Sequence, residues 1–151
     1  PEAQSDRFLL KIKVGYPTFE DEKMIVDKYA TDKTLPSLRT LIGKQSLLTM
    51  QQHTRQVPMA NDVRDKVLRI IGATREKKDI IQYGASPRAS IGLILAAKAR
   101  ALIQGKNHVS TEDIKHMAYP ILRHRIILNF EAERKGMSTD DAVKEIIDKV
   151  K

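Results

Sequence analysis

The spacing of apolar side chains divides the chain near residue 17. Residues 8–14 alternate between apolar and polar side chains, a period of two that is typical of a half-buried strand. Gly15 and Pro17 would end that strand. From Thr18 onward, apolar residues recur every three or four positions, as they do on one face of a helix. The pattern therefore predicts a mainly α fold, a helical bundle preceded by one β-strand.

Capping residues mark where most of these helices are expected to begin. Ser, Thr and Asn side chains accept hydrogen bonds from the free N–H groups of a first helical turn, and they precede the apolar stretches at Thr18, Asn61, Ser86, Ser110 and Ser138. Further helices are predicted over residues 46–57, and over 121–128 after a break or kink at Pro120. Residues 31–45 are predicted to be a linker.

The helix that begins after Ser86 is the most apolar of the series. It is apolar on nearly every side as far as Gln104. A helix of that kind belongs in a protein interior, so we expect it to be the central, buried helix of the bundle.

The first turn of that helix carries an arginine where a cation is disfavoured. Ser86 suits the N-cap and Pro87 the first helical position, which places Arg88 next to the positive end of the helix dipole. A cation there costs about 0.3–1 kcal/mol. Arg88 could pair with a surface acid, which is worth little. It could instead join the helix N–H groups in binding an anion such as phosphate.

Charge and composition narrow the classes of function without selecting one. The net charge is +8, but each half of the chain carries the same surplus of basic residues, with no basic tail. Aromatic residues that could stack on bases are few, with three Phe, four Tyr and no Trp. Nucleic-acid binding is therefore not favoured. No apolar run is long enough to span a membrane.

Common catalytic and metal-binding motifs are absent. The segment at 43–46, Gly-Lys-Gln-Ser, lacks both the upstream glycine and the Ser or Thr after the lysine that a phosphate-binding loop requires. The chain has no cysteine, and its four histidines do not form a zinc motif, so no metal site is expected. No hydrolase nucleophile motif is present.

Two long stretches together resemble a known family. Residues 1–17 (PEAQSDRFLLKIKVGYP) and 83–128 (YGASPRASIGLILAAKARALIQGKNHVSTEDIKHMAYPILRHRIIL) are similar to the C-terminal part of the MoxR-type AAA+ ATPases. The resemblance covers nearly the whole chain and is weak over 33–57. Ser5 occupies a position that is usually apolar in the family, but this departure does not affect the neighbouring arginine.

The resemblance implies a domain division and roles for individual residues. Residues 1–17 would end the α/β nucleotide-binding core, and residues 18–151 would form the helical lid. Arg88 would be the sensor-2 arginine, which reaches the γ-phosphate of ATP in its own subunit. Arg7 would be the arginine finger, which enters the neighbouring subunit's site; spacing alone favours instead a salt bridge with Asp6 or Glu2. The nucleotide-binding set would also include Ser86 and Pro87, and Tyr16 and Pro17 near the hinge.

The resemblance also implies a cofactor, an assembly and a task. The intact protein would bind ATP with Mg²⁺, assemble as a ring-shaped homo-oligomer and work in the cytoplasm. It would remodel or activate a partner protein in a chaperone-like way, and partners of the family often carry a von Willebrand factor A-type domain. The Walker A, Walker B and sensor-1 segments are absent from these 151 residues. They are expected upstream, so the fragment alone should neither hydrolyse ATP nor bind it well.

Two alternatives remain open at this level. The chain could be the lid of a magnesium-chelatase-type subunit or another AAA+ motor. It could also be a non-enzymatic, basic helical module that binds DNA or an acidic protein, in which case binding should weaken steeply with salt. The roles of Arg123, His124 and Arg125 are likewise open, because the sequence does not decide whether they contact a neighbour or pack within the chain.

Overall fold

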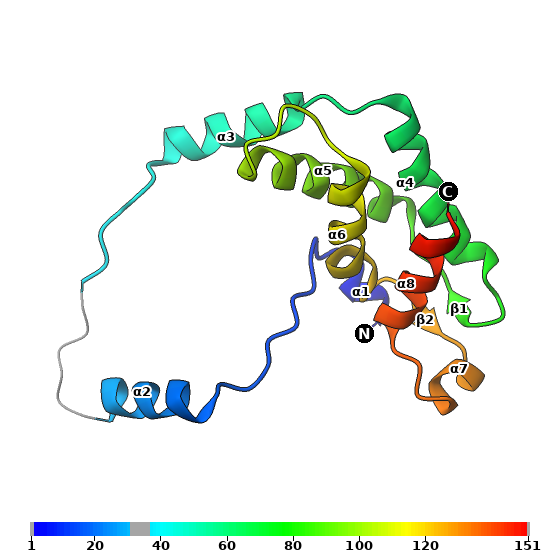
Figure 1. Cartoon of the computed structure of the whole chain (residues 1–151), viewed down its shortest axis with the longest axis horizontal. Helices are drawn as coiled ribbons and strands as arrows, with labels where there is room; N and C mark the ends of the chain where they lie inside the picture. The colour runs from blue at the N-terminus through cyan, green and yellow to red at the C-terminus, as the bar shows by residue number, and fades with distance from the viewer. Residues whose placement is uncertain (1, 31–36, 151) are drawn as a thin grey trace.

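The computed structural model describes residues 2–30 and 37–150, and it is mainly helical (Figure 1). The helices are α1 (Glu2–Ser5), α2 (Phe19–Tyr29), α3 (Lys44–Gln56), α4 (Asn61–Glu76), α5 (Pro87–Ile103), α6 (Thr111–Leu122), α7 (Phe130–Arg134) and α8 (Thr139–Lys149). Two short strands, β1 (Ile81–Tyr83) and β2 (Ile127–Leu128), complete the described elements. The predicted mainly α fold is confirmed.

Helix α5 runs through the middle of the bundle, with α4 and α6 packed against it (Figure 1). Its buried face is made of small residues and one leucine: Ala89, Gly92, Leu93, Ala96, Ala97 and Ala101. Small side chains let the neighbouring helices approach closely. The prediction that this helix is central is confirmed, but it is not buried all round, because Ile91 and Ile103 are 61% and 85% exposed.

The other core helices are amphipathic. Helix α4 buries Val63, Val67, Ile70 and Ile71, which recur every three or four positions as the apolar pattern after Thr18 predicts, together with Thr74. Helix α8 packs its apolar face onto α4 and α6. Burial of these faces supplies most of the stability of the bundle, at about 25 cal/mol per Å² of apolar surface.

Four of the five predicted N-caps are confirmed by hydrogen bonds. Thr18, Ser110 and Ser138 each form a capping box with an aspartate three residues later, and the Ser86 side chain accepts a bond from the amide of Arg88. Asn61 is instead the first residue of α4, and Ala60 occupies the N-cap position.

The sequence patterns gave no sign of the small sheet. Strands β1 and β2 pair antiparallel, with Ile81 opposite Leu128 and Tyr83 opposite Ile127. The predicted helix over 121–128 is wrong, because α6 continues through Pro120 to Leu122 and the chain then forms β2. Strands of two or three residues are too short to show an alternating pattern.

The predicted strand over residues 8–14 does not form. From residue 10 to 18 the chain is without regular structure, and its apolar side chains are exposed, with Ile12 at 74% and Val14 at 89%. A strand exists only when its N–H and C=O groups pair with a neighbouring strand. Among the described residues no strand lies beside this segment.

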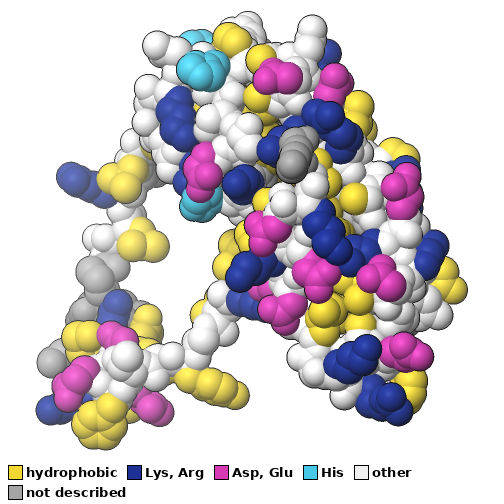
Figure 2. All heavy atoms as spheres, turned by 45° about the vertical axis from the view of Figure 1, so that its right-hand side comes forward, with side chains coloured by type: hydrophobic (Ala, Val, Ile, Leu, Met, Phe, Trp, Pro, Cys, Tyr) yellow, Lys and Arg dark blue, Asp and Glu magenta, His cyan; other side chains and the backbone are white. Residues whose placement is uncertain are grey.

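Residues 14–30 leave the bundle as an arm that carries α2, and residues 37–43 lead into α3 (Figure 1). None of the residues of α2 or α3 is buried. Figure 2 shows α2 standing apart from the bundle, with apolar and acidic side chains on its surface. Of the predicted linker, residues 31–36 lie outside the described residues, 37–43 are irregular, and 44–45 begin α3. No described helix has the length and apolar character needed to cross a bilayer.

Candidate functional site

The N-terminus of α5 places Arg88 on the surface. Ser86 caps the helix by accepting a 3.3 Å hydrogen bond from the Arg88 amide, and Pro87 occupies the first helical position. The side chain of Arg88 is 71% exposed, and its Nη1 lies 3.9 Å from Oδ2 of Asp6. That separation is an ion pair without a hydrogen bond. The guanidinium therefore retains its donors for another partner.

Asp6 links this helix end to the N-terminal segment. Its carboxylate accepts hydrogen bonds from the Ser86 hydroxyl, at 2.9 and 3.2 Å, and from Nε of Arg125, at 3.1 Å. The acid that the sequence offered as a partner for Arg7 is thus bonded to Ser86 and Arg125. The guanidinium of Arg88 is the third group beside this carboxylate, after the Ser86 hydroxyl and Arg125 Nε, and lies farther away, at 3.9 Å.

Arg7 is exposed beside this carboxylate. Its guanidinium carbon lies 5.2 Å from the centroid of the Phe8 ring, a distance at which a cation is attracted to the face of an aromatic ring. The backbone on both sides of Arg7 is held by the bundle, through Asp6 and through the carbonyl of Phe8. The position of Arg7 is therefore set by the bundle while its side chain faces outward.

Arg125 makes the strongest of these attachments. Its side chain is 3% exposed, and it donates to the backbone carbonyls of Asp6, Phe8 and Leu9 and to that of Ile121 in α6. Burial lowers the pKa of Arg125, against the opposing effect of the Asp6 carboxylate, and the charge of Arg88 lowers it further.

Arg123 and His124 hold the same segment further along. Arg123 donates from Nη1 to the carbonyl of Lys11 at 3.2 Å, and pairs through Nε with Asp140 at 3.0 Å. His124 Nε2 lies 2.9 Å from the carbonyl of Phe8, so this nitrogen carries the proton and donates. All three residues of unassigned role therefore pack within the chain, and the charges of Arg123 and Arg125 are paired there with Asp140 and Asp6.

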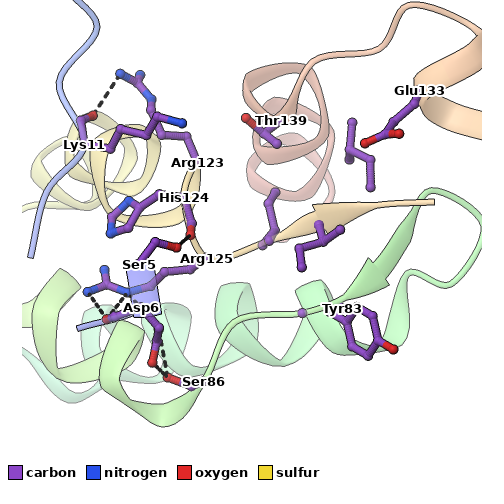
Figure 3. Close-up of a pocket in the computed structure, with 14 residues that line it drawn as sticks. Ser5, Asp6, Lys11, Tyr83, Ser86, Arg123, His124, Arg125, Glu133 and Thr139 are labelled. Carbon is purple, nitrogen blue, oxygen red and sulfur yellow. Dashed lines mark hydrogen bonds and ion pairs between the residues drawn. The ribbon is translucent and has the colours of Figure 1, made fainter. Parts of the chain in front are cut away.

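These residues surround a cavity of about 540 Å³ between the N-terminal segment, β2 and the start of α8 (Figure 3). Its lining includes the basic residues Lys11, Arg123, His124 and Arg125 and the acidic residues Asp6 and Glu133. Arg88 is not part of the lining. One wall of the cavity is thus formed by the segment before residue 12, and the others by the bundle.

Lowering the pH is expected to weaken the attachment of this segment through His124. Burial lowers the pKa of His124 from 6.5, the charges of Arg125 and Lys11 act in the same direction, and the bond to Phe8 opposes them. Nδ1 is buried without a hydrogen-bond partner, so protonation there is unfavourable. Because the unfolded chain then binds the proton more readily, the free energy of unfolding falls as the pH drops below about 6.5.

Urea unfolding between pH 7.5 and 5.5 measures this effect, with His124→Gln compared with the parent. The parent should lose more stability over this interval than the variant. His108→Gln, which removes an exposed histidine, is the control and should retain the parent's pH dependence. Equal slopes for His124→Gln and the parent would contradict the assignment.

Tyr16 and Pro17, predicted to lie near the nucleotide, are not part of this cluster. Both lie in the arm, and the Tyr16 side chain is fully exposed, at 103%. The structure thus brings together Ser86, Arg88 and the segment that carries Arg7, and leaves Tyr16 and Pro17 apart from them.

Sequence reasoning missed the parts played by Asp6 and Arg125. The sequence offers Asp6 only as a salt-bridge partner of its neighbour Arg7, and it leaves open whether Arg125 contacts a neighbouring subunit or packs within the chain. They are 119 positions apart in the chain, so no local spacing could show that they meet. A buried arginine has to find acceptors for its donors, but the pattern of residues 121–128 predicts a helix and does not show that Arg125 is buried.

Comparison with known proteins identifies the bundle. A family model of the AAA lid domain matches residues 73–146. The chain is 34% identical to YeaC of Bacillus subtilis over 151 residues, which is 100% of this chain and 47% of YeaC. It is 34% identical to the chaperone MoxR1 of Mycobacterium tuberculosis over 158 residues, covering 99% of this chain and 41% of MoxR1.

A solved structure agrees with these relatives. The crystal structure of a candidate ATPase from Cytophaga hutchinsonii superposes with a TM-score of 0.90 at 34% identity, over 100% of this chain and 48% of that one. The chain thus spans about half the length of the relatives that it matches. It belongs to the MoxR-type AAA+ ATPases and contains their AAA lid domain.

Proposed function

We propose that this chain is the lid part of an ATP hydrolase, and that Arg88 is its sensor-2 arginine. In the intact protein, Arg88 would bind the γ-phosphate of ATP held in the same subunit. The observation that carries this proposal is the state of the side chain: it is 71% exposed at a helix N-terminus, and within the described residues it makes one long ion pair, with Asp6 at 3.9 Å. An arginine kept free at the positive end of a helix is suited to a polyanion.

The residues at this helix end fit the phosphate part of ATP. Arg88 offers a forked set of N–H donors that matches phosphate oxygens, and Ser86 and Pro87 shape the turn from which it projects. Among residues 2–30 and 37–150, no group of three or more His, Asp or Glu side chains could hold a metal ion. Ligands for the Mg²⁺ that accompanies ATP in AAA+ proteins would therefore come from other parts of the intact protein.

Arg7 is proposed as the arginine finger for the neighbouring subunit. It is exposed, and the backbone around it is fixed, which suits a residue that has to reach a partner at a defined position. In this role the guanidinium would stabilise charge that develops on the phosphoryl oxygens during hydrolysis. This proposal also requires a ring-shaped homo-oligomer.

The proposed domain division places residues 1–17 at the end of the α/β core and residues 18–151 in the lid. Support comes from the exposed, alternating apolar residues between 10 and 16, among them Ile12 and Val14, which would add a strand to the sheet of the core. Tyr16 and Pro17 would then lie near the hinge between the two domains. Residues 5–11 already contact the bundle, so the lid would hold the core's last segment.

The proposed task is chaperone-like. MoxR1 of Mycobacterium tuberculosis is named a chaperone, and the same use of ATP here would remodel or activate a partner protein in the cytoplasm. A partner with a von Willebrand factor A-type domain is proposed on the family resemblance alone. When the γ-phosphate is lost, Arg88 would lose its main partner, and the lid would be free to rotate about the hinge.

The test is the ATPase rate of the intact protein, measured at concentrations where rings form. Arg88→Ala and Arg7→Ala are each expected to lose at least tenfold in rate, about 1.4 kcal/mol of transition-state stabilisation. Arg64→Ala, which removes an exposed arginine of α4, is the control and should be unchanged. The isolated 151 residues should show no turnover.

Mixing experiments separate the two roles. Arg7→Ala should still bind ATP, and its activity should return when it is mixed with subunits that have an inactivated nucleotide site but an intact Arg7. Arg88→Ala should not be rescued in this way, because Arg88 would act within its own subunit. Full activity of both variants would leave the chain's family membership intact and refute the proposed roles.

A further inference from the structure

The N–H groups of the Arg125 guanidinium donate all their hydrogen bonds to residues 6–9 and to helix α6. Nε donates to Asp6, to both its carbonyl and its carboxylate at 3.3 and 3.1 Å. One terminal nitrogen donates to Leu9 at 3.2 Å and to Ile121 at 2.9 Å. The other donates to the carbonyls of Asp6, at 3.1 Å, and of Phe8. A buried arginine with this many backbone acceptors fixes the path of the chain around it.

Helix α5 is shaped to leave room for this arrangement. Gly92 lies in the middle of the helix, where glycine costs about 1 kcal/mol relative to alanine. A Cβ atom there would stand 3.2 Å from Leu9 Cδ1 and 3.8 Å from Arg125 Nη1. The glycine thus lets the segment and the guanidinium approach the helix.

Asp6 connects the clamped segment to the proposed nucleotide sensor. The same carboxylate bonds Arg125 and the N-cap hydroxyl of Ser86, and lies 3.9 Å from the guanidinium of Arg88. Figure 3 shows the side chains of Asp6, Ser86 and Arg125 converging on one another from three separate parts of the chain. Arg7, between the clamped residues Asp6 and Phe8, is therefore part of the same rigid unit as the start of α5.

We propose that Arg125 is a positioning residue that fixes Arg7 to the lid, so that the sensor of one nucleotide site and the finger of the next move as one body. The inference rests on the proposed function of Arg7 and Arg88. It adds that the segment clamped by Arg125 moves with the lid, so the bend between core and lid would fall before Asp6 and not at Tyr16 and Pro17. A rotation of the lid, set by the nucleotide in its own subunit, then repositions the arginine given to the neighbour. Arg125 touches neither nucleotide, and acts only through the backbone of residues 6–9.

The intact protein with Arg125→Gln tests this inference. The ATPase rate at saturating ATP should fall at least tenfold, while the Kd for ATP stays within about threefold of the parent. Mixing with subunits that have an inactivated nucleotide site but native Arg7 and Arg125 should restore activity, as for Arg7→Ala. Amide hydrogen exchange of residues 6–9 should become at least tenfold faster, a readout that does not depend on ATP.

Arg123→Gln is the matched control. It removes the contacts with Lys11 and Asp140 but leaves every bond to Asp6, Phe8 and Leu9, so the rate and the exchange of residues 6–9 should stay near those of the parent. Arg125→Lys keeps the positive charge without the fork, and should recover little of the lost rate. Full recovery by lysine would show that charge alone is needed, and would overturn the positioning role.

Asp6→Asn provides a second variant in case Arg125→Gln does not fold. It keeps an acceptor for Ser86 but removes the charge that faces Arg125, and should show the same rescue on mixing. A loss of rate in these variants that mixing does not rescue, or no loss at all, would overturn the inference while the response of Arg7→Ala still tests the proposed function. If Arg7→Ala itself behaves as the parent, the proposed function fails, whatever Arg125 does.

Discussion

Asp113→Asn is expected to lower the free energy of unfolding by about 3 kcal/mol, because it breaks a buried, multiply bonded ion pair. The Asp113 side chain is 0% exposed, and its carboxylate pairs with Arg100 and with Lys106, the latter at 2.8 Å. It also accepts bonds from the amide and the hydroxyl of Ser110, at 2.9 and 2.7 Å. An amide would leave two cations beside a neutral group and lose one acceptor.

The chain contains a matched control for this variant. Asp141 makes the same two bonds to its own N-cap, at 2.9 Å to the Ser138 amide and 2.6 Å from the Ser138 hydroxyl, but it is exposed and forms no buried ion pair. Asp141→Asn should therefore cost much less. Urea unfolding of both variants at pH 7 measures the difference; equal losses would show that the capping box, and not the buried pair, carries the stability.

The pH dependence of the parent gives a second check on Asp113. Burial would raise the pKa of this carboxyl, but the bonds from Lys106, Ser110 and Arg100 outweigh it and hold the pKa far below its usual value of 3.8. The stability that it contributes is complete above about pH 4 and is lost as the pH falls further. Asp113→Asn should remove that part of the acid dependence.

Gly84→Ala is expected to cost about 2–3 kcal/mol by overpacking. A Cβ atom on Gly84 would stand 2.6 Å from the carbonyl oxygen of Thr74 and 2.7 Å from the backbone of Arg75. Backbone atoms of a helix cannot move aside as a flexible side chain can. The chain would have to shift away from α4, which would also strain the 3.0 Å bond from the Ala85 amide to the Thr74 hydroxyl.

Gly72→Ala provides the opposite control on the same helix. Nothing lies within 4 Å of the position that its Cβ would take, so the variant should gain about 0.5–1 kcal/mol from helix propensity. Because Gly84 immediately precedes the turn that carries Ser86 and Arg88, its variant should also weaken ATP binding in the intact protein. A stability of Gly84→Ala equal to that of the parent would refute the close approach.

Local features of the helices were predictable from the sequence because their causes are local. A capping box joins residues three positions apart, and Ser110 and Ser138, both predicted as N-caps, each form one. The apolar stripe of α4 follows a period that one helix displays by itself. The same reasoning located Arg88 in the first turn of α5, and the structure adds its exposure.

The segment at 8–14 shows where this reasoning ends. Its alternating pattern is that of a strand, but strand structure depends on hydrogen bonds to a partner, and the described residues offer none there. Conversely, Ile81–Tyr83 and Ile127–Leu128 carry no clear pattern and become strands because the fold brings them together.

The sequence by itself determined the helical class, the caps and the place of Arg88, since each depends on residues within a turn of one another. Only the tertiary structure decided that Asp6 meets Arg125 and Ser86, from 119 and 80 positions away. Such contacts depend on how whole elements pack. Burial then gives them their strength, because donors withdrawn from water must find acceptors within the protein.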